Sequence, residues 1–354
     1  MKSFNLLLLR ISVLAVLVLI SSCSTVSYKD VYPILQDGKY DSEFPYKGAS
    51  DELREISQTV HRIHSSTFYK TYTFDRSANL TNENLKTADL KSLSISEGYA
   101  DQSTSGTGTA IYFNEGKVGI LTCAHLVQFP DTVISYLPDN QGSFTEFIQV
   151  IFIKERQVIY AAGFPEGGEF ELLASERRSD LAIIGKDYKI LSDLRFPVLT
   201  YPVGKAKELD WGSFVYLFGY PINYQMVTKA IVSNPNRDDY GSFLVDAVVN
   251  NGMSGGIVLA IKDGVPNFEI VGMIQWVPEE EENVLVPKKL SNNEKYNPIV
   301  PYEGEEYVKR FSSIRYGIAR VISVEAIIEF FKKNRDLLNE KKYYLDSFIL
   351  KKEK

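Results

Sequence analysis

Short apolar runs separated by turn-forming residues fill the chain from about residue 66 to residue 325. The runs are rich in Val, Ile, Phe and Tyr, and Gly, Asp, Asn and Pro stand between them, which is typical of β-strands joined by turns. Long helical patterns are absent here, so the runs fit barrels or a sandwich. Because residues 191–212 divide them into two groups of similar size, we predict an all-β protein with two β-barrels, at about 66–190 and 205–325.

A short amphipathic helix is predicted ahead of the β-rich region, within a linker at 23–65. Apolar residues recur there at helical spacing, at Leu53, Ile56, Val60 and Ile63. The same segment carries two of the three histidines of the chain, His61 and His64. They would make half of a metal site, but no other histidine or spare cysteine stands nearby in the sequence. We therefore expect a surface helix and no metal.

A second helix is predicted near the C-terminus, where Ile327, Phe330 and Phe331 lie on one face. It should pack on a barrel, and a frayed basic tail should follow at 336–354. The segment at 278–312 is charged and lacks an apolar period. We predict that it is a long exposed loop with a solvated surface, the alternative being a flap that regulates access or faces a substrate.

The N-terminus has the pattern of an export signal. Basic Lys2 and Arg10 precede an apolar run from Ile11 to Ile20, which is short for a membrane span. The following Ser21-Ser22-Cys23 completes a tetrad that resembles the bacterial lipobox. It implies a signal peptide at 1–22, lipidation of Cys23 and a periplasm-facing protein anchored in the cell envelope. A plain signal peptide or a transmembrane anchor is the alternative.

Net charge and cysteine content narrow the function further. The formal net charge of −6 over 354 residues argues against a nucleic-acid-binding surface. The chain has only two cysteines, Cys23 and Cys123. Once Cys23 is lipidated, Cys123 has no partner for a disulfide, and its apolar surroundings predict a small buried side chain.

The sequence leaves the oligomeric state open. The residue after Cys23 is Ser24 and not Asp, which favours the outer membrane.

The stretch Gly-Met-Ser-Gly-Gly at 252–256 stands between two apolar runs, where glycines gain nothing in a strand. Glycines around Ser254 clear space for a reacting group, but a serine hydroxyl needs a base to become a nucleophile. Outside the predicted helix the only histidine is His125, the candidate base. Asp180 directly precedes an apolar run, and a hydrogen bond to the imidazole would satisfy its carboxylate.

Three motifs in this order resemble those of the chymotrypsin-fold serine peptidases, above all the bacterial Deg/HtrA branch. They are Thr-Cys-Ala-His at 122–125, Ser-Asp-Leu-Ala-Ile-Ile at 179–184 and Gly-Met-Ser-Gly-Gly at 252–256. Gly-Thr-Gly-Thr at 106–109 and Gly-Tyr-Pro at 219–221 also match that branch. The resemblance covers roughly residues 100–330. It implies two six-stranded antiparallel β-barrels in a peptidase domain at 66–335.

The resemblance also assigns roles to residues. His125 would be the general base and then the general acid, Asp180 would orient it, and Ser254 would attack the acyl carbon. The backbone N–H groups of Gly252 and Ser254 would form the oxyanion hole. No cofactor or metal is implied, and the substrate would be a protein or peptide.

By the same resemblance, Gln275, Trp276 and Val277 would pair with substrate beside the specificity pocket. Gly317 would form the opposite wall, and Val248 the floor. An apolar floor without an acid implies a small or medium apolar side chain in the substrate, not Lys or Arg.

Met253 departs from the family pattern, because trypsin has Asp before its serine and the Deg/HtrA branch commonly has Asn. The chain also has too few residues after Phe330 for the PDZ module that usually follows in that branch. The lack of that module argues against processive degradation of unfolded proteins through it. Met253 leaves a catalytically silent binding protein of the same fold as a second hypothesis, although the complete triad argues against it. An esterase is a third, since Gly-Met-Ser-Gly-Gly matches the Gly-x-Ser-x-Gly pattern, but the lack of alternating long helices argues against an α/β-hydrolase.

Overall fold

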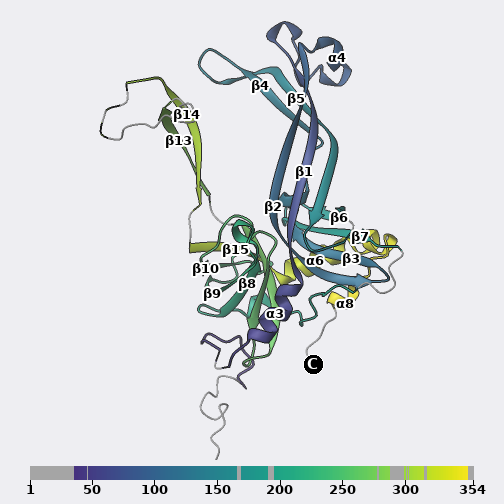
Figure 1. The fold of residues 1–354 in the computed structure, drawn as a ribbon, viewed down its shortest axis with the longest axis vertical. Helices are drawn as coiled ribbons and strands as arrows, with labels where there is room; N and C mark the ends of the chain where they lie inside the picture. Colours follow the sequence, from purple (N-terminus) through teal and green to yellow (C-terminus); the bar gives the residue numbers. More distant parts are fainter. Residues whose placement is uncertain are drawn as a thin grey trace, which may run out of the picture.

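Two closed β-barrels form the body of the computed structural model (Figure 1). It describes residues 36–349 except 46, 166–168, 190–194, 277–278, 288–298, 300, 302 and 315–316. The predicted signal peptide, Cys23 and Val277 lie outside the described residues. No helix within the described ranges combines the length and the hydropathy that crossing a membrane requires.

The first barrel is a ring of six antiparallel strands in the order β1-β2-β3-β7-β6-β5, which the pairing of β1 with β5 closes. A seventh strand, β4, pairs with the outer edge of β5. The strands are β1 (Val60–Thr73), β2 (Ser96–Asn114), β3 (Lys117–Cys123), β4 (Thr132–Pro138), β5 (Phe144–Ala161), β6 (Glu169–Glu176) and β7 (Leu181–Asp187).

The second barrel is a ring of six antiparallel strands in the order β10-β15-β12-β11-β8-β9. They are β8 (Phe214–Gly219), β9 (Met226–Asn234), β10 (Phe243–Ala247), β11 (Ile257–Ile261), β12 (Phe268–Trp276) and β15 (Gly317–Ser323). The single-turn helices η5 (Ala206–Glu208) and η6 (Pro221–Asn223) flank β8. The predicted fold of two six-stranded antiparallel barrels is confirmed.

One continuous apolar core runs through both barrels. Every residue of β8 and of β11 is buried, and β8 also contacts β1 and β2 of the first barrel. Burial of apolar surface stabilises a fold by about 25 cal/mol per Å², so this shared core holds the two barrels in a fixed relation.

A long arm rises from the first barrel, where β1, β2, β4 and β5 extend beyond the ring (Figure 1). Residues 74–95 cap the arm with η2 (Arg76–Ala78), η3 (Leu85–Thr87) and α4 (Leu90–Leu93). The arm has a small separate core beneath this cap, formed by Phe74, Leu80, Ile148 and Ile151.

The predicted N-terminal helix is shorter than expected. Helix α3 (Ser50–Gln58) contains Leu53 and Ile56, but β1 begins at Val60 and contains His61 and His64. The prediction of a helix through Ile63, and of a barrel beginning at residue 66, was therefore wrong. Pairing of β1 with β2 and β5 buries Val60 and Ile63 in the barrel, and this outweighs their local helical spacing.

The predicted loop at 278–312 is in part a β-hairpin. Strands β13 (Glu279–Pro287) and β14 (Glu306–Ile314) pair in an antiparallel ladder that projects from the barrels (Figure 1). Leu285 and Val308 are partners across it and are 65% and 71% exposed. At this pair the strands are held by backbone pairing without burial, and the segment carries no apolar period in the sequence that would reveal the hairpin.

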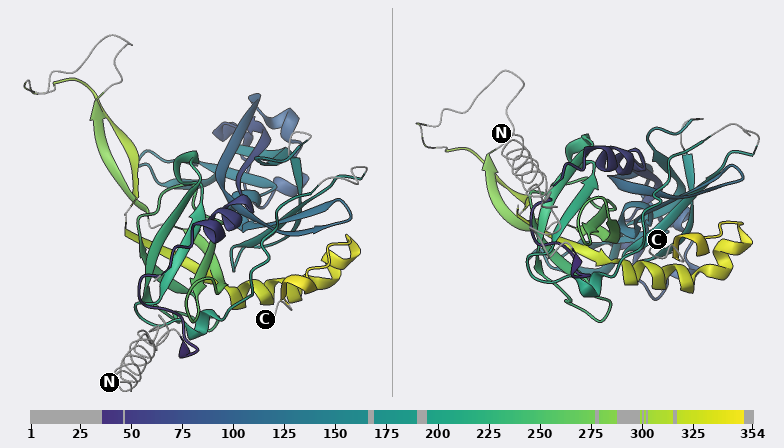
Figure 2. Two further views of the ribbon diagram at one scale, coloured as in Figure 1. Left: turned by 60° about the horizontal axis from the view of Figure 1, so that its bottom comes forward. Right: turned by 90° about the horizontal axis from the view of Figure 1, so that it is seen from below.

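The C-terminal segment continues as helices after α6 (Val324–Lys333), namely α7 (Arg335–Glu340) and α8 (Asp346–Ile349). Figure 2 shows these helices lying along both barrels. The predicted closing helix is present, but the prediction of a frayed tail at 336–354 was wrong for residues 336–349. Apolar residues dock this segment: the Phe348 ring lies 5.7 Å from that of Phe331, and Tyr343 lies 5.6 Å from Tyr112.

Candidate active site

His125 and Asp180 meet because β3 and β7 are paired. Cys123 at the end of β3 is the register partner of Leu181 at the start of β7, so the residues just beyond the ladder face each other. His125 lies in the one-turn helix α5 (Ala124–Val127). Asp180 has a left-handed backbone with φ of 57°, and its carbonyl accepts the N–H of Ala124 at 3.1 Å.

Two hydrogen bonds orient the imidazole on the carboxylate. Oδ1 of Asp180 accepts the backbone N–H of His125 at 2.9 Å, and Oδ2 lies 2.8 Å from Nδ1. The neutral imidazole bonded in this way donates from Nδ1 and leaves Nε2 as an acceptor. The side chains are 43% and 12% exposed, so the ring reaches solvent while the carboxylate is shielded.

Cys123 packs against this pair. Its thiol is buried, and the ligand atoms of Cys123, His125 and Asp180 lie within 4.8 Å of one another. Burial, and then the negative charge of Asp180, raise the pKa of the thiol well above its usual value, so the sulfur is protonated. The three side chains are close enough to hold an ion, but both carboxylate oxygens already accept bonds from His125.

Ser254 follows a tight turn at 250–253, just before β11. The carbonyl of Asn250 accepts the N–H of Met253 at 3.2 Å, and Gly252 has φ of 100°. This combination defines a type II turn, which favours glycine at its third position. The N–H of Ile222 donates to the carbonyl of Asn251 at 3.0 Å. Because the C=O and N–H of a trans peptide point in opposite directions, the N–H of Gly252 points away from Ile222.

Close contact with the first barrel explains the glycine after Ser254. A Cβ at Gly255 would lie 2.0 Å from the carbonyl oxygen of Thr107 on β2. The backbone N–H of Thr107 donates to the carbonyl of Ser254 at 2.8 Å. Met253 is fully buried in the shared core, so this position serves packing here.

Among the described residues, two backbone N–H groups beside the serine lack an acceptor. Among the residues that the structure describes, neither the N–H of Gly252 nor that of Ser254 makes a hydrogen bond. The described part of the chain also shows no hydrogen bond between the Ser254 hydroxyl and His125. Strand β2 contacts both the histidine segment and the serine turn. Thr104 Oγ1 donates to the carbonyl of Leu126 at 2.8 Å, and Thr107, three residues later in the strand, bonds to Ser254.

The predicted specificity residues are only partly brought together. Val248 is 80% exposed, so the prediction that it forms a pocket floor was wrong in this structure: it follows the end of β10, beyond the ladder that buries Ala247. Gly317 begins β15 opposite Ala247. Gln275 and Trp276 end β12, and the buried Oε1 of Gln275 has no hydrogen-bond partner among the described residues.

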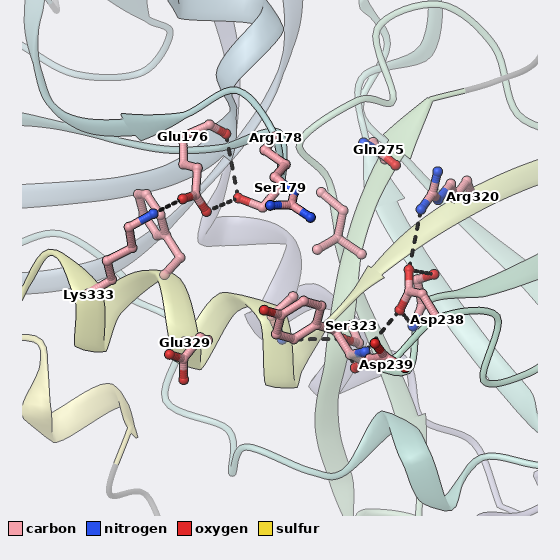
Figure 3. A pocket seen from close by; sticks show the side chains of 15 residues that line it. Glu176, Arg178, Ser179, Asp238, Asp239, Gln275, Arg320, Ser323, Glu329 and Lys333 are labelled. Carbon is pink, nitrogen blue, oxygen red and sulfur yellow. Dashed lines mark hydrogen bonds and ion pairs between the residues drawn. The ribbon is translucent and has the colours of Figure 1, made fainter.

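A polar cavity of about 490 Å³ lies between the β6–β7 turn, the β9–β10 loop and α6 (Figure 3). Ser179, next to Asp180, and Gln275 line it. Lys333 forms an ion pair with Glu176, whose other carboxylate oxygen accepts the hydroxyl of Ser179 at 2.7 Å. No sequence motif indicates this cavity, because its lining comes from segments that are far apart in the chain.

One family of known proteins matches the part of the chain that carries His125, Asp180 and Ser254. Residues 106–273 match the family model of the trypsin-like peptidase domain. A search of curated protein sequences returns no match.

Similar solved structures include the HtrA-type protease AlgW with a decapeptide, at 15% identity and a TM-score of 0.42, covering 82% of this chain and 67% of that one. AlgW with a tripeptide has 15% identity, a TM-score of 0.40 and coverage of 81% and 64%. Deg5 has 14% identity, a TM-score of 0.36 and coverage of 64% and 83%. Residues 106–273 thus match a trypsin-like peptidase domain, and the two closed barrels to which they contribute have the chymotrypsin-like fold.

Proposed function

We propose that the chain is a serine endopeptidase that uses Ser254, His125 and Asp180 through an acyl-enzyme. One observation carries the proposal. On the first barrel, the carboxylate of Asp180 orients the imidazole of His125. On the second barrel, across β2, the turn before Ser254 presents two N–H groups that have no acceptor among the described residues. This combination supplies a base, a nucleophile and donors for an oxyanion.

The chemistry follows from these positions. Nε2 of His125 takes the proton from the Ser254 hydroxyl as Oγ attacks the peptide carbonyl carbon. The carbonyl oxygen becomes an oxyanion, which the N–H groups of Gly252 and Ser254 stabilise by about 3 kcal/mol for each donor. His125 then returns the proton to the leaving amine. Water hydrolyses the acyl-enzyme by the same steps, and Asp180 stabilises the imidazolium each time.

The proposed substrate is a protein or an extended peptide. The end of β12 at Gln275 and Trp276 is the backbone on which we expect a peptide to pair, beside the start of β15 at Gly317. Support comes from the match of residues 106–273 to the family model of the trypsin-like peptidase domain.

A fluorophosphonate probe tests the function, because it reacts only with an activated serine. We expect the full chain to be labelled at Ser254 and labelling to be lost in Ser254→Ala and His125→Ala. His64→Ala is the matched control, since it removes an exposed histidine of β1 and should leave labelling intact.

A catalytically silent trypsin-fold binding protein is the second candidate. The described residues show no hydrogen bond between Ser254 and His125, and this absence and the apolar Met253 before the serine favour it. However, catalytic hydrogen bonds are often long before substrate binds. A wild-type chain that is folded yet never labelled would decide for this alternative.

We also propose that Cys23 carries lipid and anchors the enzyme to the cell envelope facing the periplasm, with the outer membrane favoured. Each methylene of an acyl chain contributes about 0.8 kcal/mol to membrane binding, and the polar linker after Cys23 would hold the barrels away from the bilayer. Cys23→Ala should move the protein from the membrane fraction to the soluble fraction. An unchanged distribution would contradict the anchor.

A further inference from the structure

Thr107 is a fully buried threonine of β2 that contacts the serine turn of the opposite barrel. Its hydroxyl donates to the carbonyl of Gly252 at 2.6 Å and accepts the N–H of Tyr220 at 2.9 Å. Its backbone N–H donates to the carbonyl of Ser254 at 2.8 Å. One residue of the first barrel therefore holds the backbone on both sides of the nucleophile.

We propose that the hydroxyl of Thr107 is a positioning group that keeps the oxyanion turn in its catalytic form. The inference rests on the proposed serine-peptidase function. The turn at 250–253 offers its N–H groups to an oxyanion only while the peptide between Asn251 and Gly252 keeps its orientation. The N–H of Ile222 holds the carbonyl of Asn251, and the hydroxyl of Thr107 holds the carbonyl of Gly252.

Glycine alone does not select this form of the turn. A type I turn accepts most residues, glycine included, and differs from type II by a flip of the central peptide. The hydrogen bond from Ile222 to the carbonyl of Asn251 therefore has to distinguish the two, and the bond from Thr107 fixes the next peptide, between Gly252 and Met253, about which the flip would pivot. Without the hydroxyl, the carbonyl of Gly252 loses its partner, so the third residue of the turn is held less firmly and its N–H is more easily displaced from the position that faces the oxyanion.

The same strand also contacts the segment that carries the base. Thr104, three residues before Thr107, donates to the carbonyl of Leu126 beside His125. Thr122 Oγ1 donates to the carbonyl of Thr107 at 2.7 Å, which fixes β2 on β3 just before the histidine. Thr107 thus aligns the second barrel with the catalytic pair of the first.

The test compares three variants of the full chain. Thr107→Val keeps the shape but removes the hydroxyl, and Thr107→Ser keeps the hydroxyl. Thr109→Val is the matched control, because Thr109 is a buried threonine of the same strand whose hydroxyl has no partner among the described residues. Steady-state kinetics on an unfolded protein or a peptide separates kcat from KM, and a peptide boronic acid, which forms a tetrahedral adduct with the serine, reports on the oxyanion site.

We expect T107V to lower kcat by roughly tenfold to a hundredfold, below the 10²–10³ that loss of an oxyanion donor costs, with KM nearly unchanged. Its boronic-acid affinity should fall by a similar factor, which a loss of stability alone would not produce at temperatures where the protein is folded. T107S and T109V should behave as wild type.

Wild-type kcat in folded T107V, or an equal loss in T107S, would overturn the role of the hydroxyl. If T107V does not fold, Thr107→Cys replaces it, because a thiol is a weak donor. A T107C enzyme with wild-type kcat would overturn the inference as well. Wild type without Ser254-dependent activity would instead refute the proposed function, and the inference with it.

Discussion

Cys123 and Leu181 are partners at the end of the β3–β7 ladder, and this pair places His125 beside Asp180. The imidazole and the carboxylate come from positions 55 residues apart in the chain. Neither residue needs a long loop to reach the other, because each stands within two positions of the paired residues. The orientation of the imidazole is thus a property of the barrel wall, and a substitution at either residue should affect chemistry more than folding.

Asp180→Asn should lower kcat by roughly 10⁴ at neutral pH. The backbone N–H of His125 can only donate, so the amide oxygen would face it and the amide NH₂ would face Nδ1. Nδ1 would then have to accept, which leaves Nε2 protonated and unable to act as base. Steady-state kinetics checks this. Asp187→Asn, at the far end of β7, is the control, and an equal loss in both variants would contradict the tautomer argument.

Gly255→Ala should destabilise the protein by about 2–5 kcal/mol. The new Cβ would lie 2.0 Å from the main-chain oxygen of Thr107, in a backbone with φ of 86°. Gly142→Ala has a similar φ of 83° but meets nothing within 4 Å, and should cost only about 1–2 kcal/mol. Urea unfolding of both variants measures the difference. Equal costs would show that steric contact with the first barrel plays no part.

Asp41→Asn should stabilise the protein at pH 8 but not at pH 4. Partial burial, followed by the charges of Asp263, Glu43 and Asp37, raises the pKa of Asp41 to about 6. Because the pKa of Asp41 is higher in the folded than in the unfolded protein, folding favours the neutral carboxyl. Its contribution to stability is complete below about pH 4 and is lost as pH rises through 6. The gain at pH 8 should be on the order of 1 kcal/mol, since solvent screens the half-exposed carboxylate.

Urea unfolding at the two pH values measures the change for Asp41→Asn. The exposed Asp51→Asn provides the control, because Asp51 is 91% exposed and pairs with Arg54 at the surface. A gain for Asp41→Asn that is the same at pH 4 and pH 8 would refute the assignment to this carboxylate.

Cys123 should resist alkylation in the folded protein. Burial and the charge of Asp180 raise the pKa of its thiol, and the thiolate is the reactive form. In a Cys23→Ser background, a thiol-reactive dye should label Cys123 only after denaturation, as read by mass spectrometry. Rapid labelling of the native chain, at a rate comparable to that of a free thiol, would contradict the packing around His125.

The two barrels, the positions of His125 and Asp180 and the glycines around Ser254 could be predicted from the sequence. Each depends on a short pattern: apolar runs with turn residues between them, a histidine directly after a strand, and an acid directly before one. These patterns report local backbone preference and burial, which are the properties that neighbouring residues encode.

Only the tertiary structure decided the remaining features. Val60 and Ile63 read as helical but lie in β1, because two neighbouring strands bury them. Tyr343 and Phe348 turn an apparent tail into docked helices through contacts with Tyr112 and Phe331. The role of Thr107 belongs to the same class. Its partners at 220, 252 and 254 lie more than a hundred residues away in sequence, and a hydrogen bond across that separation exists only once packing brings the two barrels together.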